Sequence, residues 1–313
     1  MSAGVKHPAL LPAPLYQGCA NAWECDEGGH LNVRFQVERA QVGLMHFARH
    51  LSMGTAFRAD ATATLALTDL HVRFHKEALP GAPLSMHGAV AAFGDDDAAL
   101  CCDMRHIDGA PATTMVLKVA HAEPRMLKRY PWSSRTRAAA KALTRALPAH
   151  AKPRSIDVDT APRAITLAHA QEVGATRIGG AAVLPDQCDA FGRLRFEHFF
   201  GRASDSAPNL FAEWRRAIAD ETGAQTAGAM LEARLAIRKY PRAGDLIEVH
   251  SGMVEIGEKT VRIAHWFIDP VGGACWASME AMTLTFDPTK RKALNFSPAL
   301  RAAWAERLAP MGA

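Results

Sequence analysis

The pattern of apolar positions predicts two long helices. The first runs from Val33 to about Met53, and the second from about Phe196 to Glu221. In both, apolar residues recur at helical spacing, so each helix has one face to bury against other elements. The residues that define these faces are Val37, Leu44, Phe47 and Leu51 in the first helix, and Phe200, Leu210, Trp214 and Ile218 in the second.

Each predicted helix is followed by three stretches that alternate loosely between apolar and polar residues and are separated by glycines. Such stretches are typical of strands in an antiparallel sheet. They cover residues 84–93, 98–106 and 113–121 after the first helix, and residues 246–256, 260–268 and 274–286 after the second. One long helix with an antiparallel sheet, occurring twice, places the chain in the α+β class.

The two halves of the chain repeat at one fixed offset. Asp26 and Asp189 are 163 positions apart, and four pairs of glycines keep the same distance over more than eighty residues. A constant offset of this length indicates two copies of one structural unit. The glycine pairs are Gly29 and Gly192, Gly81 and Gly244, Gly94 and Gly257, and Gly109 and Gly272.

The repeat predicts the domain organisation. Residues 15–125 form the first repeat, residues 126–177 a linker, residues 178–288 the second repeat and residues 289–313 a tail. The linker starts with a basic stretch and contains a predicted amphipathic helix, Arg135 to Leu147. The tail contains a predicted helix from Pro298 to Leu308.

The composition is that of a folded protein. With 49% hydrophobic and 22% charged residues among 313, a disordered chain, a collagen-like chain and a coiled coil are excluded. Lys and Arg number 36 against 32 Asp and Glu, and a net charge of +4 spread along the chain does not indicate nucleic-acid binding.

The cysteines and the N-terminus predict a reduced, cytoplasmic protein. Six cysteines are too few for a disulfide scaffold, and none forms the C-x-x-C pair of a zinc knuckle. Three prolines interrupt Met1 to Tyr16, which lacks the apolar core of a signal peptide. No stretch approaches the ~20 apolar residues of a membrane span, so no membrane association is expected.

The first repeat resembles a known family at one stretch. Asp26-Glu27-Gly28-Gly29-His30-Leu31-Asn32-Val33-Arg34-Phe35 is similar to the Asp-x-x-Gly-His-Met-Asn-Val-x-Tyr stretch of hotdog-fold thioesterases, the 4-hydroxybenzoyl-CoA thioesterase and acyl-ACP thioesterase superfamily. Leu replaces the usual Met, and Phe stands near the usual aromatic residue. The stretch Leu79-Pro80-Gly81-Ala82-Pro83-Leu84 also fits. The resemblance covers nearly the whole chain apart from the linker and the two ends, and implies a double hotdog, in which each repeat wraps an antiparallel sheet around a long helix.

The resemblance implies a thioesterase that hydrolyses an acyl-CoA or acyl-carrier-protein thioester. Asp26 would act as general base or as nucleophile, and the amides around Gly29 and His30 would hold the oxyanion. His30 could orient the carboxylate or donate to the carbonyl, and Asn32 could fix the water or the thioester. In the alternative interpretation, Asp26 closes an Asx turn and Asn32 caps the helix.

The second repeat departs from this pattern. Asp189 and Gly192 are kept, but Arg193 stands in the place of His30 and Arg195 in the place of Asn32. The two arginines could bind an acidic group, or could pair with Asp189 and hold it ionised and inert. We therefore expect the working site in the first repeat, although the sequence leaves the reverse open.

The resemblance points to one further acidic residue. Some relatives carry an acidic pair about eleven and twelve residues after the histidine, where this chain has Gln41 and Val42. The matched positions in the second repeat are Ser204 and Asp205. Asp205 could therefore face the His30 loop, or it could be an ordinary residue of the helix surface.

Two rival functions remain open at the level of sequence. A hotdog enoyl-CoA hydratase uses a wider spacing than the four positions from Asp26 to His30, and a non-catalytic acyl-CoA-binding module would explain the altered second loop. The histidines lack ligand-like spacing, so no metal is expected, and coenzyme A enters only as part of the substrate. The basic linker and residues 290–292 could hold its phosphates or be solvated charge. A monomer and a homodimer are both compatible with the fused pair.

Overall fold

The computed structural model describes residues 11–160, 164–223 and 225–309. The prediction about the N-terminal segment therefore falls partly outside the described residues. The chain divides into two compact units: unit 1 comprises Met1–Leu67 and Phe74–Lys152, and unit 2 comprises Thr68–Arg73 and Pro153–Ala313. The division falls inside the predicted linker, so the first part of that segment belongs to unit 1 and the remainder to unit 2.

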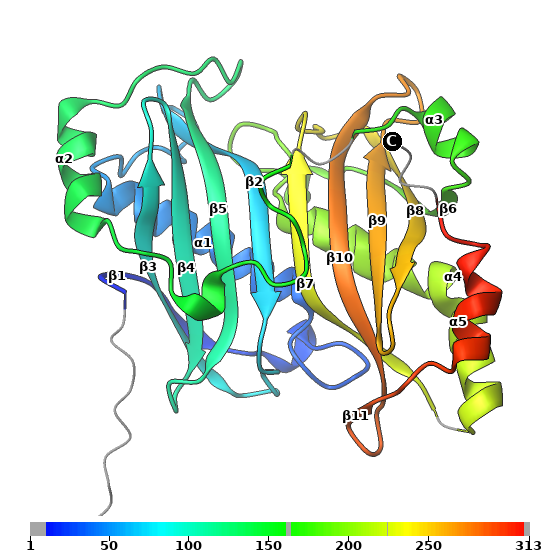
Figure 1. Cartoon of the computed structure of the whole chain (residues 1–313). Helices are drawn as coiled ribbons and strands as arrows, with labels where there is room; N and C mark the ends of the chain where they lie inside the picture. Colours follow the sequence, from blue (N-terminus) through cyan, green and yellow to red (C-terminus); the bar gives the residue numbers. More distant parts are fainter. Residues whose placement is uncertain (1–10, 161–163, 224, 310–313) are drawn as a thin grey trace, which may run out of the picture. The chain divides into compact units, whose positions relative to one another are not determined.

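Unit 1 places one long helix against an antiparallel sheet, in which β1, β3, β4 and β5 are neighbours in that order (Figure 1). Its elements are β1 (Ala13–Cys19), η1 (Ala22–Glu24), α1 (Val33–His50), the two ends of β2 (Thr64–Phe74, whose residues Thr68–Arg73 belong to unit 2), β3 (Pro83–Phe93), β4 (Asp97–His106), β5 (Pro111–Ala122), α2 (Ser134–Leu143) and η2 (Ala149–Ala151). The predicted stripe of α1 is buried, with Val37 and Phe47 0% exposed. A Cβ on Gly88 of β3 would lie 2.3 Å from the Phe47 ring, so the helix approaches the sheet more closely than a larger residue permits.

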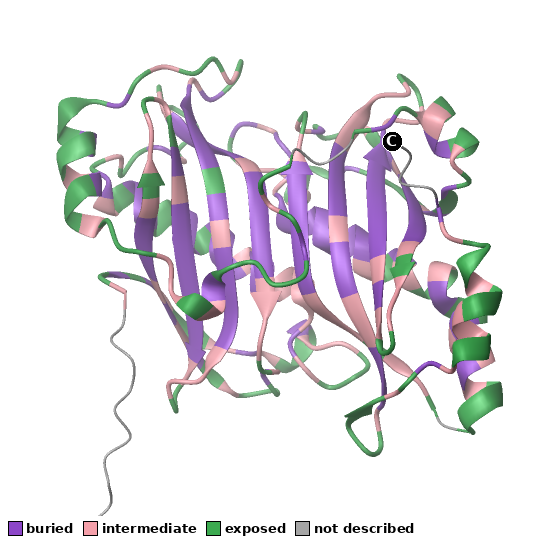
Figure 2. Cartoon of the chain, viewed as in Figure 1, coloured by how far each residue is buried: buried purple, intermediate pink, exposed green. Residues whose placement is uncertain are grey.

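Unit 2 repeats this arrangement with a longer helix. Its elements are α3 (Leu167–Glu172), β6 (Thr176–Ala182), η3 (Pro185–Gln187), α4 (Glu197–Thr222), β7 (Ala227–Ile237), β8 (Leu246–Ile256), β9 (Thr260–Ile268), β10 (Cys275–Asp287), β11 (Lys292–Ala293) and α5 (Pro298–Ala305). The strand order is β7-β10-β9-β8-β6, β11 pairs with β10, and Asp69–Arg73 of β2 pair with β7. Most positions of the central strands are buried (Figure 2).

The predicted helices and strands agree with those observed to within a few residues. The amphipathic helix predicted from Arg135 to Leu147 is shorter, because α2 ends at Leu143. The tail helix ends at Ala305 instead of Leu308. The sequence did not assign β1, β2, β6 and β7, so each repeat has more strands than the three predicted.

The main-chain conformation confirms most of the repeat and corrects one pair. Gly29 and Gly192 have φ of 71° and 75°, and Gly81 and Gly244 have φ of 83° and 96°. In the last pair, however, the partner of Gly109 (φ 79°) is Gly273 (φ 72°), not Gly272. The main-chain hydrogen bond that closes the turn joins His106 to Ala110 in the first repeat and Asp269 to Ala274 in the second, so one residue is inserted between these ends and the offset there becomes 164.

Candidate active site

The predicted catalytic loop of unit 1 is a tight turn between η1 and α1. The main-chain N–H of Asp26 donates to the His30 carbonyl at 3.0 Å, and that of Gly29 donates to the Asp26 carbonyl at 2.9 Å. The left-handed φ of Gly29 carries no steric cost for a glycine. The N–H of Leu31 donates to the Ala78 carbonyl at 2.8 Å, which ties the loop to the segment before β3. The main chain alone therefore fixes the shape of the loop.

The carboxylate of Asp26 is oriented through one of its two oxygens. Oδ1 lies 2.6 Å from His30 Nδ1 and accepts the main-chain N–H of Gly28 at 2.9 Å. Over the described residues, Oδ2 has no hydrogen-bond or ion-pair partner, in a side chain that is 21% exposed. The Asx turn of the alternative interpretation is thus present together with the pairing to His30, and one oxygen remains available to a ligand.

A second carboxylate flanks the histidine ring. Glu77, in the connection between β2 and β3, has Oε1 3.7 Å from His30 Nε2. The imidazole of His30, 17% exposed, therefore lies between the carboxylates of Asp26 and Glu77. Sequence reasoning missed Glu77, and the only signal for it was its place shortly before the Gly81 turn of the repeat, where the second copy has Tyr240.

The two predicted oxyanion amides differ in availability. The N–H of Gly29 is used inside the loop, by the carbonyl of Asp26. The N–H of His30 has no acceptor within the part of the chain that the structure describes, whereas the matched N–H of Arg193 donates to Asp189 Oδ1 at 3.0 Å. Of the predicted pair, only the His30 amide can donate to a ligand.

Asn32 occupies the N-cap of α1. Its side-chain oxygen accepts the main-chain N–H of Arg34 at 2.9 Å, and its backbone is extended, as in most N-cap residues. This is the geometry of the capping alternative. The cap fixes the point at which the loop enters the helix.

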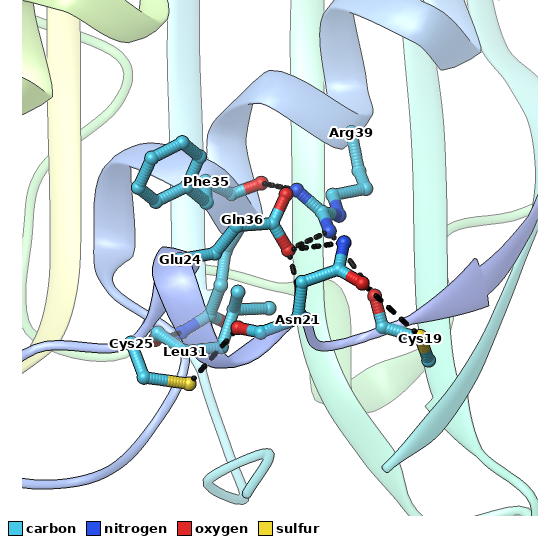
Figure 3. Close-up of polar contacts among 8 residues, drawn as sticks. All are labelled: Cys19, Asn21, Glu24, Cys25, Leu31, Phe35, Gln36 and Arg39. Carbon is cyan, nitrogen blue, oxygen red and sulfur yellow. Dashed lines mark hydrogen bonds and ion pairs between the residues drawn. The ribbon is translucent and has the colours of Figure 1, made fainter. Parts of the chain in front are cut away.

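Behind the loop, a buried ion pair joins η1 to α1 (Figure 3). Arg39 Nη2 lies 2.5 Å from Glu24 Oε2, and Arg39 also donates to the carbonyls of Phe35 and Cys19 at 3.0 and 3.2 Å. The same carboxylate accepts two N–H groups of Asn21 at 3.0 and 3.1 Å. Burial raises the pKa of Glu24, but the Arg39 and Asn21 donors outweigh it and the net pKa is lowered. Glu24 therefore stays charged and holds the turn that precedes Asp26.

The second repeat keeps the buried arginine of this pair but not the carboxylate. Arg202, the match of Arg39, donates to Gln187 Oε1 at 3.0 Å and to the carbonyls of Ala182 and His198 at 3.1 and 3.4 Å. Gln187 stands in the place of Glu24, so a neutral acceptor replaces the carboxylate.

The matched carboxylate of unit 2 is fully engaged. Asp189 Oδ1 accepts the main-chain N–H groups of Phe191 and Arg193 at 2.9 and 3.0 Å. Oδ2 accepts Arg193 Nε at 2.8 Å and lies 2.7 Å from Nη2. The guanidinium also lies over the rings of Phe191 and Tyr240, with centroid distances of 4.8 and 5.1 Å. Arg193 thus pairs with Asp189, which is one of the two alternatives predicted for this arginine.

The other two residues considered in unit 2 lie apart from Asp189. Arg195 Nε lies 2.8 Å from Glu197 Oε1, and its Nη2 lies 3.1 Å from His198 Nε2. Asp205 is exposed on α4. The idea that Asp205 faces the His30 loop stays a prediction.

The described residues contain no group of three or more His, Cys, Asp or Glu side chains placed to hold a metal ion. Among the helices in the described ranges, none is long and apolar enough to cross a membrane.

Comparisons with known proteins agree with the two repeats. A family model for the thioesterase-like superfamily matches residues 20–139 and again residues 183–304. No curated protein matches the sequence.

Several solved structures share the fold across most of the chain. A structure described as an oleoyl thioesterase from Lactobacillus plantarum has a TM-score of 0.65 at 12% identity, covering 87% of this chain and 95% of that one. The 12:0-ACP thioesterase from Umbellularia californica has a TM-score of 0.64 at 10% identity, covering 87% and 93%. An acyl-ACP thioesterase from Bacteroides thetaiotaomicron has a TM-score of 0.60 at 11% identity, covering 86% and 96%. Together with the two family matches, these likenesses confirm the predicted double-hotdog fold.

Proposed function

The chain belongs to the thioesterase-like superfamily, and we propose that it hydrolyses an acyl thioester at the Asp26 loop of unit 1. One observation carries the choice of loop. Asp26 has one oxygen available to a ligand, whereas both oxygens of Asp189 accept N–H groups of its own loop, mainly from Arg193. Two loops with the same main-chain turn therefore differ in whether their carboxylate can react.

Hydrolysis needs a base for the attacking water and a donor for the oxygen that becomes negative. Asp26 Oδ2 takes a proton from water as the water oxygen bonds to the thioester carbon. Alternatively, Oδ2 attacks that carbon itself, the C–S bond breaks as the anhydride forms and the thiolate leaves, and water then opens the anhydride to the carboxylic acid and the Asp26 carboxylate. The N–H of His30 donates to the developing oxyanion. The C–S bond then breaks, the thiolate takes up the proton, and a carboxylic acid and a free thiol leave.

The neighbours of Asp26 hold it in position for this step. His30 Nδ1 and the Gly28 N–H both bond to Oδ1, which orients the carboxylate and leaves Oδ2 for water or the thioester. Glu77 Oε1 lies 3.7 Å from His30 Nε2, so a second carboxylate flanks the ring. The proposed reaction uses no metal and no cofactor, because coenzyme A or a carrier protein arrives as part of the substrate.

The test is thiol release from acyl-CoAs of short, medium, long and aromatic acyl groups and from matching acyl-carrier proteins. Asp26→Asn should lower turnover by about 10²-fold or more, a loss in line with a catalytic acid–base group. Asp189→Asn is the matched control and should keep turnover near that of the wild type.

Other outcomes point elsewhere. A loss confined to Asp189→Asn would move the reaction to unit 2. Binding of acyl-CoA without any thiol release would favour the non-catalytic module, and hydration of an enoyl-CoA would favour the hydratase.

A further inference from the structure

An arginine lies where α1 does not favour a positive charge. Arg34 is the second residue of the helix, and no acidic residue lies in its first turn. The free N–H groups at a helix N-terminus carry partial positive charge, so a cation there is unfavourable for the helix itself. Helix stability therefore gives no reason for an arginine at this position.

The guanidinium of Arg34 has no carboxylate partner among the described residues. It lies over the ring of Phe35, with Cζ 4.9 Å from the ring centroid. Its Nε–H is buried and donates to no acceptor in the described part of the chain. A buried donor without an acceptor is unfavourable unless a ligand supplies one. The contact with Phe35 covers a face of the guanidinium plane and leaves the N–H groups at its edge for an acceptor.

In the second repeat, the arginine at the start of the long helix has an acidic partner. Arg195 stands there in the place of Asn32, and Glu197 in the place of Arg34. These two residues form an ion pair, with Nε and Oε1 2.8 Å apart. Unit 1 keeps a positive residue at this turn without the acidic one, so no carboxylate of the described residues pairs with Arg34.

The position of Arg34 relates this charge to the proposed site. Arg34 lies four positions after His30 in the chain, so their Cα atoms are at most ~14 Å apart. A guanidinium binds the oxygens of a carboxylate or phosphate through two parallel N–H groups. We infer that Arg34 binds an anionic group of the thioester substrate. This group is a phosphate of the CoA or phosphopantetheine carrier, or a carboxylate on the acyl group. The inference rests on the proposed function for the nature of that substrate.

The experiment measures equilibrium binding of four thioethers, which cannot be hydrolysed. They are S-butyl and S-(3-carboxypropyl) derivatives, each on coenzyme A and on pantetheine, which has no phosphate. Arg34→Gln should weaken binding about tenfold for every ligand that carries the recognised anion, and Arg34→Lys should recover part of the loss. Arg49→Gln is the matched control, because Arg49 is exposed in the last turn of the same helix.

The four ligands separate the sources of the anion. A loss with both CoA ligands assigns Arg34 to phosphate, and a loss with both carboxypropyl ligands assigns it to the acyl carboxylate. An equal loss with all four ligands, a loss no larger than that of Arg49→Gln, or no binding of any ligand by the wild type would overturn the inference. Because binding requires no turnover, a wild type that binds these ligands but hydrolyses no thioester contradicts the proposed function alone.

Discussion

At the scale of single residues, one of the exchanges between the two loops accounts for the different state of their carboxylates. Asp26 and Asp189 sit in main-chain turns with the same hydrogen bonds, and the exchange of His30 for Arg193 changes which carboxylate oxygens are occupied. This exchange could be predicted from the sequence, because the fixed offset aligns the two loops. Glu77 could not be, because it reaches His30 through the fold across 47 positions and no spacing rule links them.

Another exchange between the repeats lies in the core and makes stability depend on pH. His265 is 2% exposed and its Nδ1 lies 2.6 Å from the hydroxyl of Ser251, where the first repeat has Cys102 and Gly88. Burial lowers the pKa of His265 to about 4, from an ordinary 6.5. Since the unfolded chain binds the proton first, stability is present above pH 6.5 and decreases as the pH falls from 6.5 to about 4. A shift of this size corresponds to about 3 kcal/mol.

We expect His265→Gln to remove this part of the pH dependence. Urea unfolding at pH 7 and pH 4.5 should show a smaller loss of stability for the variant than for the wild type, whatever their difference at pH 7. Equal losses of stability in the two proteins would mean that His265 binds a proton as readily in the folded protein as in the unfolded chain, contrary to this argument.

At the scale of elements, the two long helices were predictable, and strands β1, β2, β6 and β7 were not. The long helices are recognisable in the sequence by a one-sided apolar stripe. Strand β2 has no such simple pattern, because Asp69, His71 and Arg73 alternate with Leu70 and Val72. The sequence interpretation gave no strand here, because charged residues usually face solvent. In the structure Asp69 and His71 are buried and pair with residues of β7, so the polar face belongs to the interior of unit 2.

The start of α1 gives a prediction that separates stability from catalysis. Asn32→Ala removes the acceptor for the Arg34 N–H and should cost about 1 kcal/mol in thermal or urea unfolding. Asn32→Ser keeps a capping oxygen and should recover most of that stability, together with turnover near the wild-type value. A serine variant that is stable but has lost turnover would instead give the Asn32 amide the role at the thioester that the family resemblance implies.

At the scale of the whole molecule, the segment predicted as a linker is fixed by β7. Glu232 accepts the main-chain N–H groups of Arg154 and Ser155 at 2.9 and 2.8 Å, and lies 2.7 Å from His71 Nε2. Two residues further along β7, Arg234 donates to the carbonyls of two residues of the same segment and lies 2.7 Å from Asp69 Oδ2. The Glu232 carboxylate thus binds main-chain N–H groups of the segment, and the Arg234 guanidinium binds its main-chain carbonyls. A composition rich in proline indicated a connector, but could not show that buried charges anchor it.

The anchor predicts how the chain responds to acid. Glu232 is 2% exposed; burial raises its pKa, but the donors from His71, Arg154 and Ser155 outweigh this and lower it below its ordinary 4.5. A lowered carboxyl pKa stabilises the fold above pH 4.5, and this contribution is lost as the pH falls further. Glu232→Gln should therefore cost about 2 kcal/mol at pH 7, because the amide replaces one carboxylate oxygen and leaves a buried N–H donor without an acceptor. The deficit should shrink as urea unfolding is repeated at pH values progressively below 4.5, because the contribution of the charged wild-type carboxylate is lost there. Glu258→Gln, at an exposed position of unit 2, should leave both measurements unchanged. A deficit for Glu232→Gln that stays constant with pH would show that the side chain acts through its shape and not through its charge.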